Sequence, residues 1–407
     1  MNKGTHLRIL FYLLFLVCDL KAQVITIYNE QNSELPFNTV RCLEIQNNSI
    51  WIGTDVGLAK LENEQWEVYT SLNSPLYSDD IRSIKSEGDS VVWIGTVQGG
   101  LFSFNGTDWV NYNVSNSGLQ DNLVRDINID LNNNIWLATT EGVFMYDRTD
   151  WYHWNIQDNN LLTNNITSIE IGLHNEKYVG TINGGIIYFD SINQFIEYTL
   201  INSDLPDNSV VDIQLSPSGQ PWFISPAAGL VTDNGIGGPW TYYNQMNSGI
   251  STSSLNCLKF YGSQIAIGSE VAGLIFKNND SWEFLNSGNS NLPDDHILSI
   301  QVDNNQNIWA GTFNGGLCKI AFENSLSTLK QNSFIIYPNM VSSNGTVHFE
   351  HSFSGILRMY NSVGELVFHK KCINQNQFIL PINIGAGHYQ ITLSSGNSKK
   401  TQQLIIR

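Results

Sequence analysis

The stretch IWIGTDVGL at residues 50–58 is followed by close copies, VWIGTVQGGL at residues 92–101 and IWLATTEGV at residues 135–143. Four further copies follow. The residues that open the seven copies are Trp51, Trp93, Trp136, Tyr178, Trp222, Ala266 and Trp309, which gives steps of 42, 43, 42, 44, 44 and 43 residues. A period in the low forties is typical of the blades of a β-propeller.

One repeat contains four short strand-like segments. In the third repeat, residues 124–129 are rich in β-forming side chains, and the segments IWLAT, GVFMYD and WYHW follow after polar turns. A single four-stranded sheet that is apolar on both faces cannot bury them alone, so the copies stack around an axis. The sequence therefore predicts an all-β fold, with a seven-bladed β-propeller over residues 23–322.

The recurring tryptophan allows two interpretations. Aromatic rings stack on sugars and bases, but a ring that returns at one register of the second strand also suits a core between blades. We expect core packing.

The ends of the repeat region predict how the ring closes. The last copy stops after its third strand, GGLCKIAF, at residues 315–322. Residues 24–40 resemble the end of a repeat, as in residues 109–124. We therefore expect residues 24–28 to supply the fourth strand of the last blade.

Composition narrows the possible partners. Charged residues make up 14% of the 407 residues, and the formal net charge is −17. Residues 23–333 hold 11 Lys and Arg against 34 Asp and Glu, whereas residues 334–407 hold 6 against 2. Because an acidic body repels phosphate groups, we expect neither nucleic acid nor an anionic membrane surface as a partner.

Residues 1–22 have the layout of a secretory signal peptide. Two basic residues precede the apolar run ILFYLLFLV, which is too short for a stable membrane span, and cleavage is expected between Ala22 and Gln23. Lipid attachment at Cys18 is an alternative, although bulky residues precede it. We expect no transmembrane span in the mature chain. Its four cysteines, Cys42, Cys257, Cys318 and Cys372, match no small disulfide framework, and buried free thiols are the simpler interpretation.

The C-terminal part has a different character. After a polar linker at residues 323–333, residues 334–407 alternate strand-like segments with Gly and Asn turns and show no forty-residue repeat. This pattern predicts a small Ig-like β-sandwich.

Two resemblances follow from these motifs. The pattern LPxN…(I/L)WIGTxxG(G)L resembles the two-component-regulator propeller repeat of periplasmic sensors in Bacteroidetes-like bacteria, and we expect no membrane span or kinase to follow it here. The tail, with YPN, MYNSVGELV, GAGHYQITL and QLIIR, resembles the C-terminal sorting domain of type IX secretion substrates, although Met340 stands where Pro is usual. This resemblance implies export through the periplasm to the outer surface or the medium, with the type IX secretion machinery as partner.

Residues suited to catalysis or metal binding are scattered along the chain. The segments DLNNN at 130–134 and DNNQN at 303–307 resemble the start of a calcium loop, but an apolar strand follows each, so hairpin turns are expected. We predict neither a metal nor another cofactor, and no catalytic residues.

Arginines form the candidate ligand-binding site. The position after the first apolar residue of each first strand is Arg41, Arg82 and Arg125 in the first three repeats, and then Thr167, Val211, Asn256 and Leu298. In a propeller this strand lines the axial channel, so three guanidinium groups would meet an anionic or polar ligand at its mouth. The alternative is that each pairs with a local acid, such as Asp79, Asp80, Asp121 or Asp126.

Three functions remain open at this point. The preferred one is a secreted or cell-surface, non-catalytic propeller that binds a glycan or a protein. A second is a propeller lyase acting on a uronic polysaccharide or a cyclic lactone, for which His296 is the one histidine at the start of a first strand. A third is a sensor subunit for a partner histidine kinase.

Overall fold

The computed structural model describes residues 23–191, 194–233, 237, 239–278, 281–322, 336–337, 340–341, 345–381, 384–395 and 398–407. The predicted signal peptide, with Ala22 of its cleavage site, and the predicted linker lie outside the described residues. Residues 23–322 form one compact unit, and the C-terminal strands belong to another.

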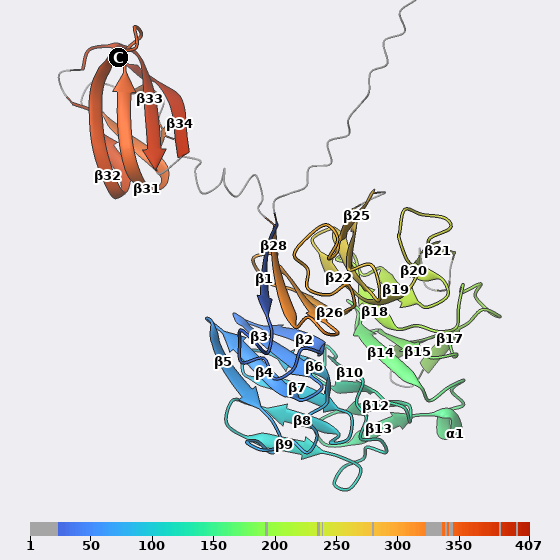
Figure 1. Cartoon of the computed structure of the whole chain (residues 1–407). Helices are drawn as coiled ribbons and strands as arrows, with labels where there is room; N and C mark the ends of the chain where they lie inside the picture. The colour runs from blue at the N-terminus through green and yellow to red at the C-terminus, as the bar shows by residue number, and fades with distance from the viewer. Residues whose placement is uncertain are drawn as a thin grey trace, which may run out of the picture. The chain divides into compact units, whose positions relative to one another are not determined.

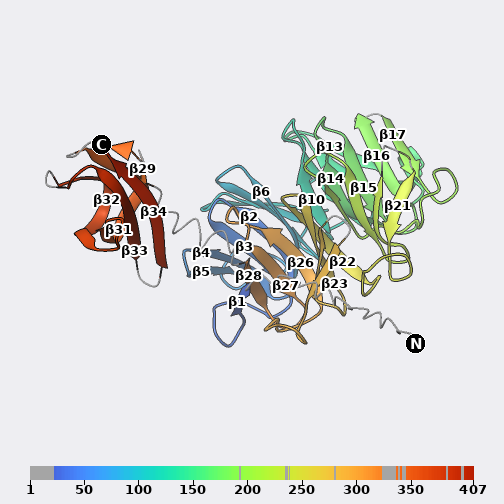
Figure 2. The same cartoon turned by 90° about the horizontal axis from the view of Figure 1, so that it is seen from above.

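Seven four-stranded antiparallel sheets follow one another around a ring in the described part of residues 23–322 (Figures 1 and 2). The first sheet contains β2 (Val40–Gln46), β3 (Ser49–Thr54), β4 (Gly57–Glu62) and β5 (Gln65–Tyr69). The second contains β6 (Ile81–Glu87), β7 (Val91–Thr96), β8 (Leu101–Phe104) and β9 (Trp109–Tyr112). The third contains β10 (Asp126–Ile129), β11 (Ile135–Ala138), β12 (Val143–Tyr146) and β13 (Trp151–Trp154), followed by the short helix α1 (Ile156–Asn159).

The remaining sheets repeat this order. The fourth contains β14 (Ile166–Ile171), β15 (Lys177–Thr181), β16 (Ile186–Ser191) and β17 (Gln194–Tyr198). The fifth contains β18 (Asp212–Leu215), β19 (Pro221–Ser225), β20 (Gly229–Asp233) and β21 (Trp240–Tyr243). The sixth contains β22 (Leu255–Tyr261), β23 (Gln264–Ser269), β24 (Leu274–Asn278) and β25 (Ser281–Leu285). The last contains β26 (Ile297–Val302), β27 (Ile308–Thr312), β28 (Leu317–Phe322) and, from the other end of the chain, β1 (Gln23–Tyr28).

The second strands carry the core between neighbouring sheets. Strands β3, β11 and β27 are buried along their whole length. Trp51 of β3 packs against Ile81 and Phe102 of the next sheet, and its indole N–H donates to Gln46 at 3.1 Å. Trp136 is fully buried in the same way. The prediction that these rings are core residues is confirmed.

The TxxG part of the repeat closes the turn between the second and third strands. The buried hydroxyl of Thr139 donates to the carbonyl oxygen of Gly142 at 2.8 Å. Gly142 has φ of 120°, and a Cβ there would collide with the carbonyl oxygen of Trp154 on the fourth strand. Glycine is therefore required at this position, because other residues would be strained and would clash.

The two ends of the repeat region meet in the last sheet. Strand β1 pairs antiparallel with β28, from Gln23 opposite Phe322 to Tyr28 opposite Leu317. On the inner side, Ser299 donates its hydroxyl to the carbonyl oxygen of Val40 at 3.3 Å. These contacts connect the last sheet to both the N-terminal strand and the first sheet.

The C-terminal unit is a small β-domain. It contains β29 (Ile336–Tyr337), β30 (Met340–Val341), β31 (Thr346–Tyr360), β32 (Leu366–Ile379), β33 (Gly387–Ser395) and β34 (Ser398–Ile406). Hydrogen bonds join the strands in the order β29-β31-β33-β34-β30, and β32 pairs with β31. A single cluster that includes Leu357, Phe378 and Leu404 forms its core. The predicted all-β propeller is confirmed. The described strands of the C-terminal unit are joined in one sheet, and its predicted Ig-like β-sandwich architecture stays a prediction. In the described part of the chain, no helix has the length and apolar character that crossing a bilayer requires.

Candidate functional site

The first strands of the seven sheets surround an axial channel with a volume of about 260 Å³. We group its lining residues into three levels by their position along these strands, and we call the level where the strands begin the mouth. The mouth level holds Arg41, Arg82, Arg125, Thr167, Val211, Asn256 and Leu298. The next level, the throat, holds Cys42, Ser83, Asp126, Ser168, Asp212, Cys257 and Ser299. The third level, the floor, holds Glu44, Lys85, Asn128, Glu170, Gln214, Lys259 and Gln301.

A β-bulge places most of the mouth residues. In β2, β6, β14, β22 and β26, the pairing with the second strand skips one residue near the start of the strand. In β2 the pairing passes from Val40 to Cys42, so Arg41 is the skipped residue, and Arg82 has the same place in β6. Because a bulge releases a residue from the ladder and bends the strand, these side chains leave the sheet at the mouth.

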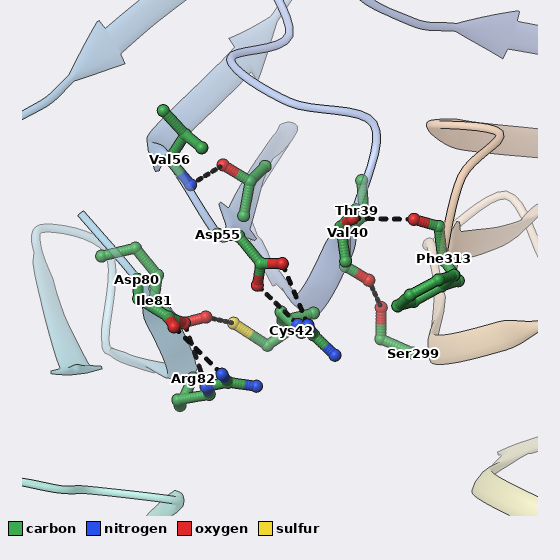
Figure 3. A network of polar contacts seen from close by, with 12 residues as sticks. Thr39, Val40, Cys42, Asp55, Val56, Asp80, Ile81, Arg82, Ser299 and Phe313 are labelled. Atoms are coloured by element: carbon green, nitrogen blue, oxygen red, sulfur yellow. Dashed lines mark hydrogen bonds and ion pairs between the residues drawn. The ribbon is translucent and has the colours of Figure 1, made fainter. Parts of the chain in front are cut away.

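Arg41 is held by a carboxylate on the neighbouring turn. Its Nε and Nη2 donate to the two oxygens of Asp55 at 2.6 and 2.9 Å, and this hydrogen bonding raises the pKa of Arg41. The two side chains are 24% and 25% exposed. The Cζ of Arg41 also lies 5.9 Å from the centre of the Phe313 ring, on the last sheet. Figure 3 shows this group of contacts at the junction of the first, second and last sheets.

Arg82 pairs with Asp80, two residues before it. Its Nη2 donates to Oδ2 of Asp80 at 3.0 Å, and its Nε lies 3.0 Å from Oδ1 (Figure 3). Desolvation raises the pKa of Asp80, and the positive charge of Arg82 opposes this shift only in part. About a third of each side chain is exposed. The pair therefore stays in contact with solvent at the mouth.

Arg125 differs from the other two because its partners are neutral. Its Nη1 donates to the side-chain oxygen of Asn165 and, at 3.0 Å, to the carbonyl oxygen of Ile166. Within the described residues, no carboxylate oxygen lies within 4.0 Å of it. Desolvation lowers its pKa; the negative charge of Asp121 opposes this shift in part, and the positive charge of Arg82 adds to it. Asp121, an expected partner, instead accepts from the backbone and hydroxyl of Thr140 at 2.9 and 2.5 Å.

The structure thus brings the three predicted arginines together at the mouth and gives them unequal partners. Of the acids expected as partners, Asp80 pairs with its arginine, whereas Asp79 binds Ser71 instead. The partner that sequence reasoning missed is Asp55. It occupies the turn between the second and third strands, where the repeat varies most, so no recurring signal pointed to it.

Below the mouth lie further charged residues. Sequence reasoning named Asp126 only as a possible partner of an arginine, with which it forms no ion pair among the described residues, and missed the others. Asp126 and Asp212 lie in the throat, where desolvation raises the pKa of Asp126 to about 6 and that of Asp212 to about 7. On the floor, desolvation raises the pKa of Glu170. Burial opposes the charge of Lys85, but the carboxylates around it outweigh this effect and raise its pKa. In the sequence, these charged residues stand one or three positions after the mouth residue of each repeat, so comparing those positions between repeats would have identified them.

The residues considered for calcium binding and for lyase activity make contacts within the propeller. Asp130 accepts from the backbone of Asn132 and Asn134 and from the indole of Trp136, all at 2.9–3.0 Å, so the expected hairpin turn is confirmed. His296 stacks on Phe313, with ring centres 5.0 Å apart, and is not among the residues that line the channel. In the described part of the chain, no group of three His, Cys, Asp or Glu side chains is arranged to hold a metal.

The cysteines of the described residues are all free thiols. Cys257, Cys318 and Cys372 are buried, and Cys42 is half-buried between the first two sheets. Desolvation raises the pKa of each.

Comparison with known proteins matches both parts of the chain. Residues 335–407 match the family described as the secretion system C-terminal sorting domain, and residues 291–314 match the two component regulator propeller. No curated protein matches the sequence. The sorting domain indicates export to the cell surface or into the medium by type IX secretion.

Several solved structures share the fold. The extracellular domain of the hybrid two-component system BT3049 from B. thetaiotaomicron is 18% identical, with 94% of this chain and 57% of that chain covered and a TM-score of 0.63. PorZ, a surface component of the type IX secretion system of Porphyromonas gingivalis, is 14% identical, with 91% and 60% covered and a TM-score of 0.60. Virginiamycin B lyase from Staphylococcus aureus is 12% identical, with 74% and 99% covered and a TM-score of 0.61.

At these identities the likeness shows the fold alone, and the chain spans 57% and 60% of the first two proteins. The family matches assign two parts of the chain to known sequence families, which the shared fold alone does not do. Residues 335–407 are matched by the secretion system C-terminal sorting domain, and residues 291–314, in the last sheet of the propeller, by the two component regulator propeller.

Proposed function

We propose that the propeller is a non-catalytic binding module of the cell surface or the medium, and that it takes a polar or anionic group of a glycan or a protein at the channel mouth. Arg41, Arg82 and Arg125 are the residues that contact this group. The observation that carries the proposal is Arg125, a cation at the mouth whose described hydrogen-bond partners are neutral.

Electrostatics supports this assignment. Two of the three cations at the mouth have a carboxylate beside them, so Arg125 adds a positive charge to a unit that is acidic overall. A guanidinium group has five N–H donors, and Asp55 occupies two of those on Arg41. Donors therefore remain for a carboxylate, sulfate or sugar oxygen, and a planar anion would bind to two of them at once.

The other mouth residues suit a ligand that is not purely ionic. Val211 is 37% exposed beside the channel, and Thr167 and Asn256 bind carbonyl oxygens of the next sheet at 2.6 and 2.9 Å. One side of the mouth is thus cationic and the other is neutral. A ligand with an anionic end and a less polar body fits this division.

The test compares two arginine variants of the full mature chain. Labelled protein is titrated onto an array of acidic and neutral glycans and onto intact cells of the source bacterium, at low and high salt. We expect saturable binding that weakens with salt and is lost in Arg125→Gln. The matched control is Arg148→Gln: Arg148 is 33% exposed and pairs with Glu87 at 2.9 Å, on the turn between the third and fourth strands.

The control variant should bind like the unmodified protein. Equal loss in Arg125→Gln and Arg148→Gln would mean that general charge, and not the mouth, causes binding. Absence of saturable binding by the unmodified chain to both glycans and cells would also contradict the proposal.

A further inference from the structure

The turns of each sheet lie at two ends. In an antiparallel meander, the turn between the second and third strands and the connection to the next sheet share one end, and the other two turns share the opposite end. Because the first strands begin at the mouth, the first set of turns surrounds it. We call that end the mouth face and the other end the opposite face.

The mouth face exposes large apolar side chains. Leu72, Ile201 and Met246, each in the connection from one sheet to the next, are 96%, 94% and 97% exposed. Tyr77, in the same connection as Leu72, is 75% exposed, and Val271, between β23 and β24, is 65% exposed. A single exposed apolar side chain is ordinary on a protein surface, but several on the loops of one face indicate contact with another molecule.

The opposite face has a different composition. Its turns between the first and second strands carry exposed polar residues such as Asn47, Asn48 and Asn304. Its described turns expose the large apolar side chains Leu131 and Leu173, at 66% and 61%, and Val24, Val110 and Tyr152 are 52%, 47% and 39% exposed near the start of fourth strands. The apolar surface of the ring is therefore concentrated at the mouth.

The apolar side chains continue into the arginine site. Phe313, which is 37% exposed, lies between β27 and β28 and contacts the guanidinium group of Arg41. Val56, which is 44% exposed, directly follows Asp55, the carboxylate that holds Arg41. The mouth arginines and these exposed apolar side chains thus lie on the same face of the ring.

This combination of aliphatic side chains and arginines favours a protein over a sugar. Protein interfaces are enriched in Tyr, Phe, Met and Arg, all of which the mouth face presents. An exposed aliphatic tip such as Leu72 or Ile201 offers no hydrogen bond to a hydroxyl group and no flat ring for a sugar to stack on. The three arginines favour a carboxylate at the centre of the interface.

We infer that the mouth face is the docking surface for a protein partner that places an Asp or Glu side chain at the arginines and apolar side chains on the surrounding loop tips. The inference rests on the proposed function and narrows its ligand from a glycan or a protein to a protein.

Photocrosslinking from single positions tests it. The variants Leu72→Cys, Ile201→Cys and Met246→Cys are labelled with a benzophenone maleimide, as are the matched controls Leu131→Cys and Leu173→Cys from the opposite face. The native thiols resist labelling, because burial raises the pKa of Cys42, Cys257, Cys318 and Cys372. The labelled full-length mature protein is irradiated on intact cells of the source bacterium, and adducts are mapped by mass spectrometry.

We expect protease-sensitive adducts from the mouth-face positions and none from the controls. The crosslinked peptide should contain an Asp or Glu flanked by apolar residues, and its yield should fall about tenfold when Arg125→Gln is added. Equal adducts from both faces, adducts to a second copy of this chain, or no protein adducts would overturn the inference. Arginine-dependent binding to a glycan without protein adducts would leave the proposed function intact and contradict this inference alone.

Discussion

Two positions occur once in every repeat but differ in how much their residue type changes. The lead residue, which opens each copy of the repeated phrase, lies in the second strand, and the mouth residue lies at the start of the first strand. The lead residue is a buried tryptophan in four repeats, Trp51, Trp93, Trp136 and Trp309, and each indole N–H donates to a side chain of its own sheet. The mouth residue changes from arginine in the first three repeats to Thr, Val, Asn and Leu in the others. Packing between two sheets restricts the first position, whereas the channel leaves the second free to differ.

This difference separates stability from binding. A core position between two sheets must fill the space that its neighbours leave, because protein interiors are close-packed. The residue there is a buried tryptophan in four repeats, Tyr178 in the fourth and Ala266 in the sixth. A residue at the channel mouth contacts a turn or the start of a neighbouring sheet and stays partly exposed to solvent, so its identity can follow the ligand. We therefore expect mouth residues that differ between repeats to bind the ligand. We expect core residues that recur in most repeats to stabilise the fold.

The largest effect should come from removing the strand that joins the two chain ends. Deleting residues 24–29 leaves β28 with an unpaired edge, so we expect loss of cooperative melting and aggregation, measured by calorimetry and light scattering. A synthetic peptide of residues 23–29 should restore the melting transition. A deletion variant that melts like the intact protein and stays monomeric would contradict the closure.

Replacing a core ring should cost nearly as much. Trp136→Ala removes a fully buried side chain, and we expect a loss of about 3–5 kcal/mol in the free energy of unfolding. Trp136→Phe keeps most of the volume but loses the hydrogen bond to Asp130, at a cost of about 1 kcal/mol. Val211→Ala at the mouth is the control and should change stability by about 0.5 kcal/mol or less. Denaturant titration measures all three.

These repeated features explain why the sequence predicted the fold well. The forty-residue period recurs in all seven repeats, and the TxxG turn and the buried tryptophan recur in most of them, because they depend on contacts within and between neighbouring sheets. The pairing of β1 with β28 was also visible, because residues 24–40 match the end of a repeat. The arginines could be placed at the mouth because the first strand has a known position in a propeller.

The charged partners could not be predicted in the same way. Asp55 reaches Arg41 from a turn whose residues differ between repeats, and Arg125 contacts Asn165 across a boundary between two sheets. Such contacts depend on how neighbouring sheets are placed in space. The sequence pattern marked only the mouth position of each first strand. Asp126 was therefore considered only as a partner of an arginine, and Asp212 was missed as a channel residue.

The throat carboxylates should give a moderate effect that depends on pH. The pKa of Asp212 is raised to about 7 in the folded chain, against about 3.9 when unfolded. The folded chain therefore holds this proton more tightly, so the stabilisation is complete below pH 4 and is lost as the pH rises through 7. Asp212→Asn should melt at a higher temperature than the unmodified protein at pH 8, and the difference should shrink toward pH 4.

An exposed aspartate supplies the control with the opposite sign. Hydrogen bonds from the turn at residues 149–150 lower the pKa of Asp147 to about 2, so its contribution is present above pH 4 and is lost as the pH falls toward 2. Asp147→Asn should therefore melt at a lower temperature than the unmodified protein at pH 8. Parallel pH profiles of the two variants would mean that the throat does not perturb Asp212.

The mouth arginines should have the smallest effect on stability. Arg41 and Arg82 form ion pairs that are a quarter to a third exposed, and such pairs typically contribute about 0–1 kcal/mol each. The triple variant with Arg41→Gln, Arg82→Gln and Arg125→Gln should therefore unfold within about 2 kcal/mol of the unmodified protein. Glutamine keeps a polar side chain at each position and removes the charge.

The most direct test of the division between core and mouth is to measure, on this one triple variant, both the thermal melt and the saturation isotherm for binding to intact cells of the source bacterium. The account predicts a melting temperature lowered by a few degrees and no saturable binding. A large fall in melting temperature, with unchanged affinity in the fraction that remains folded, would contradict it and would assign the three arginines to the joining of neighbouring sheets.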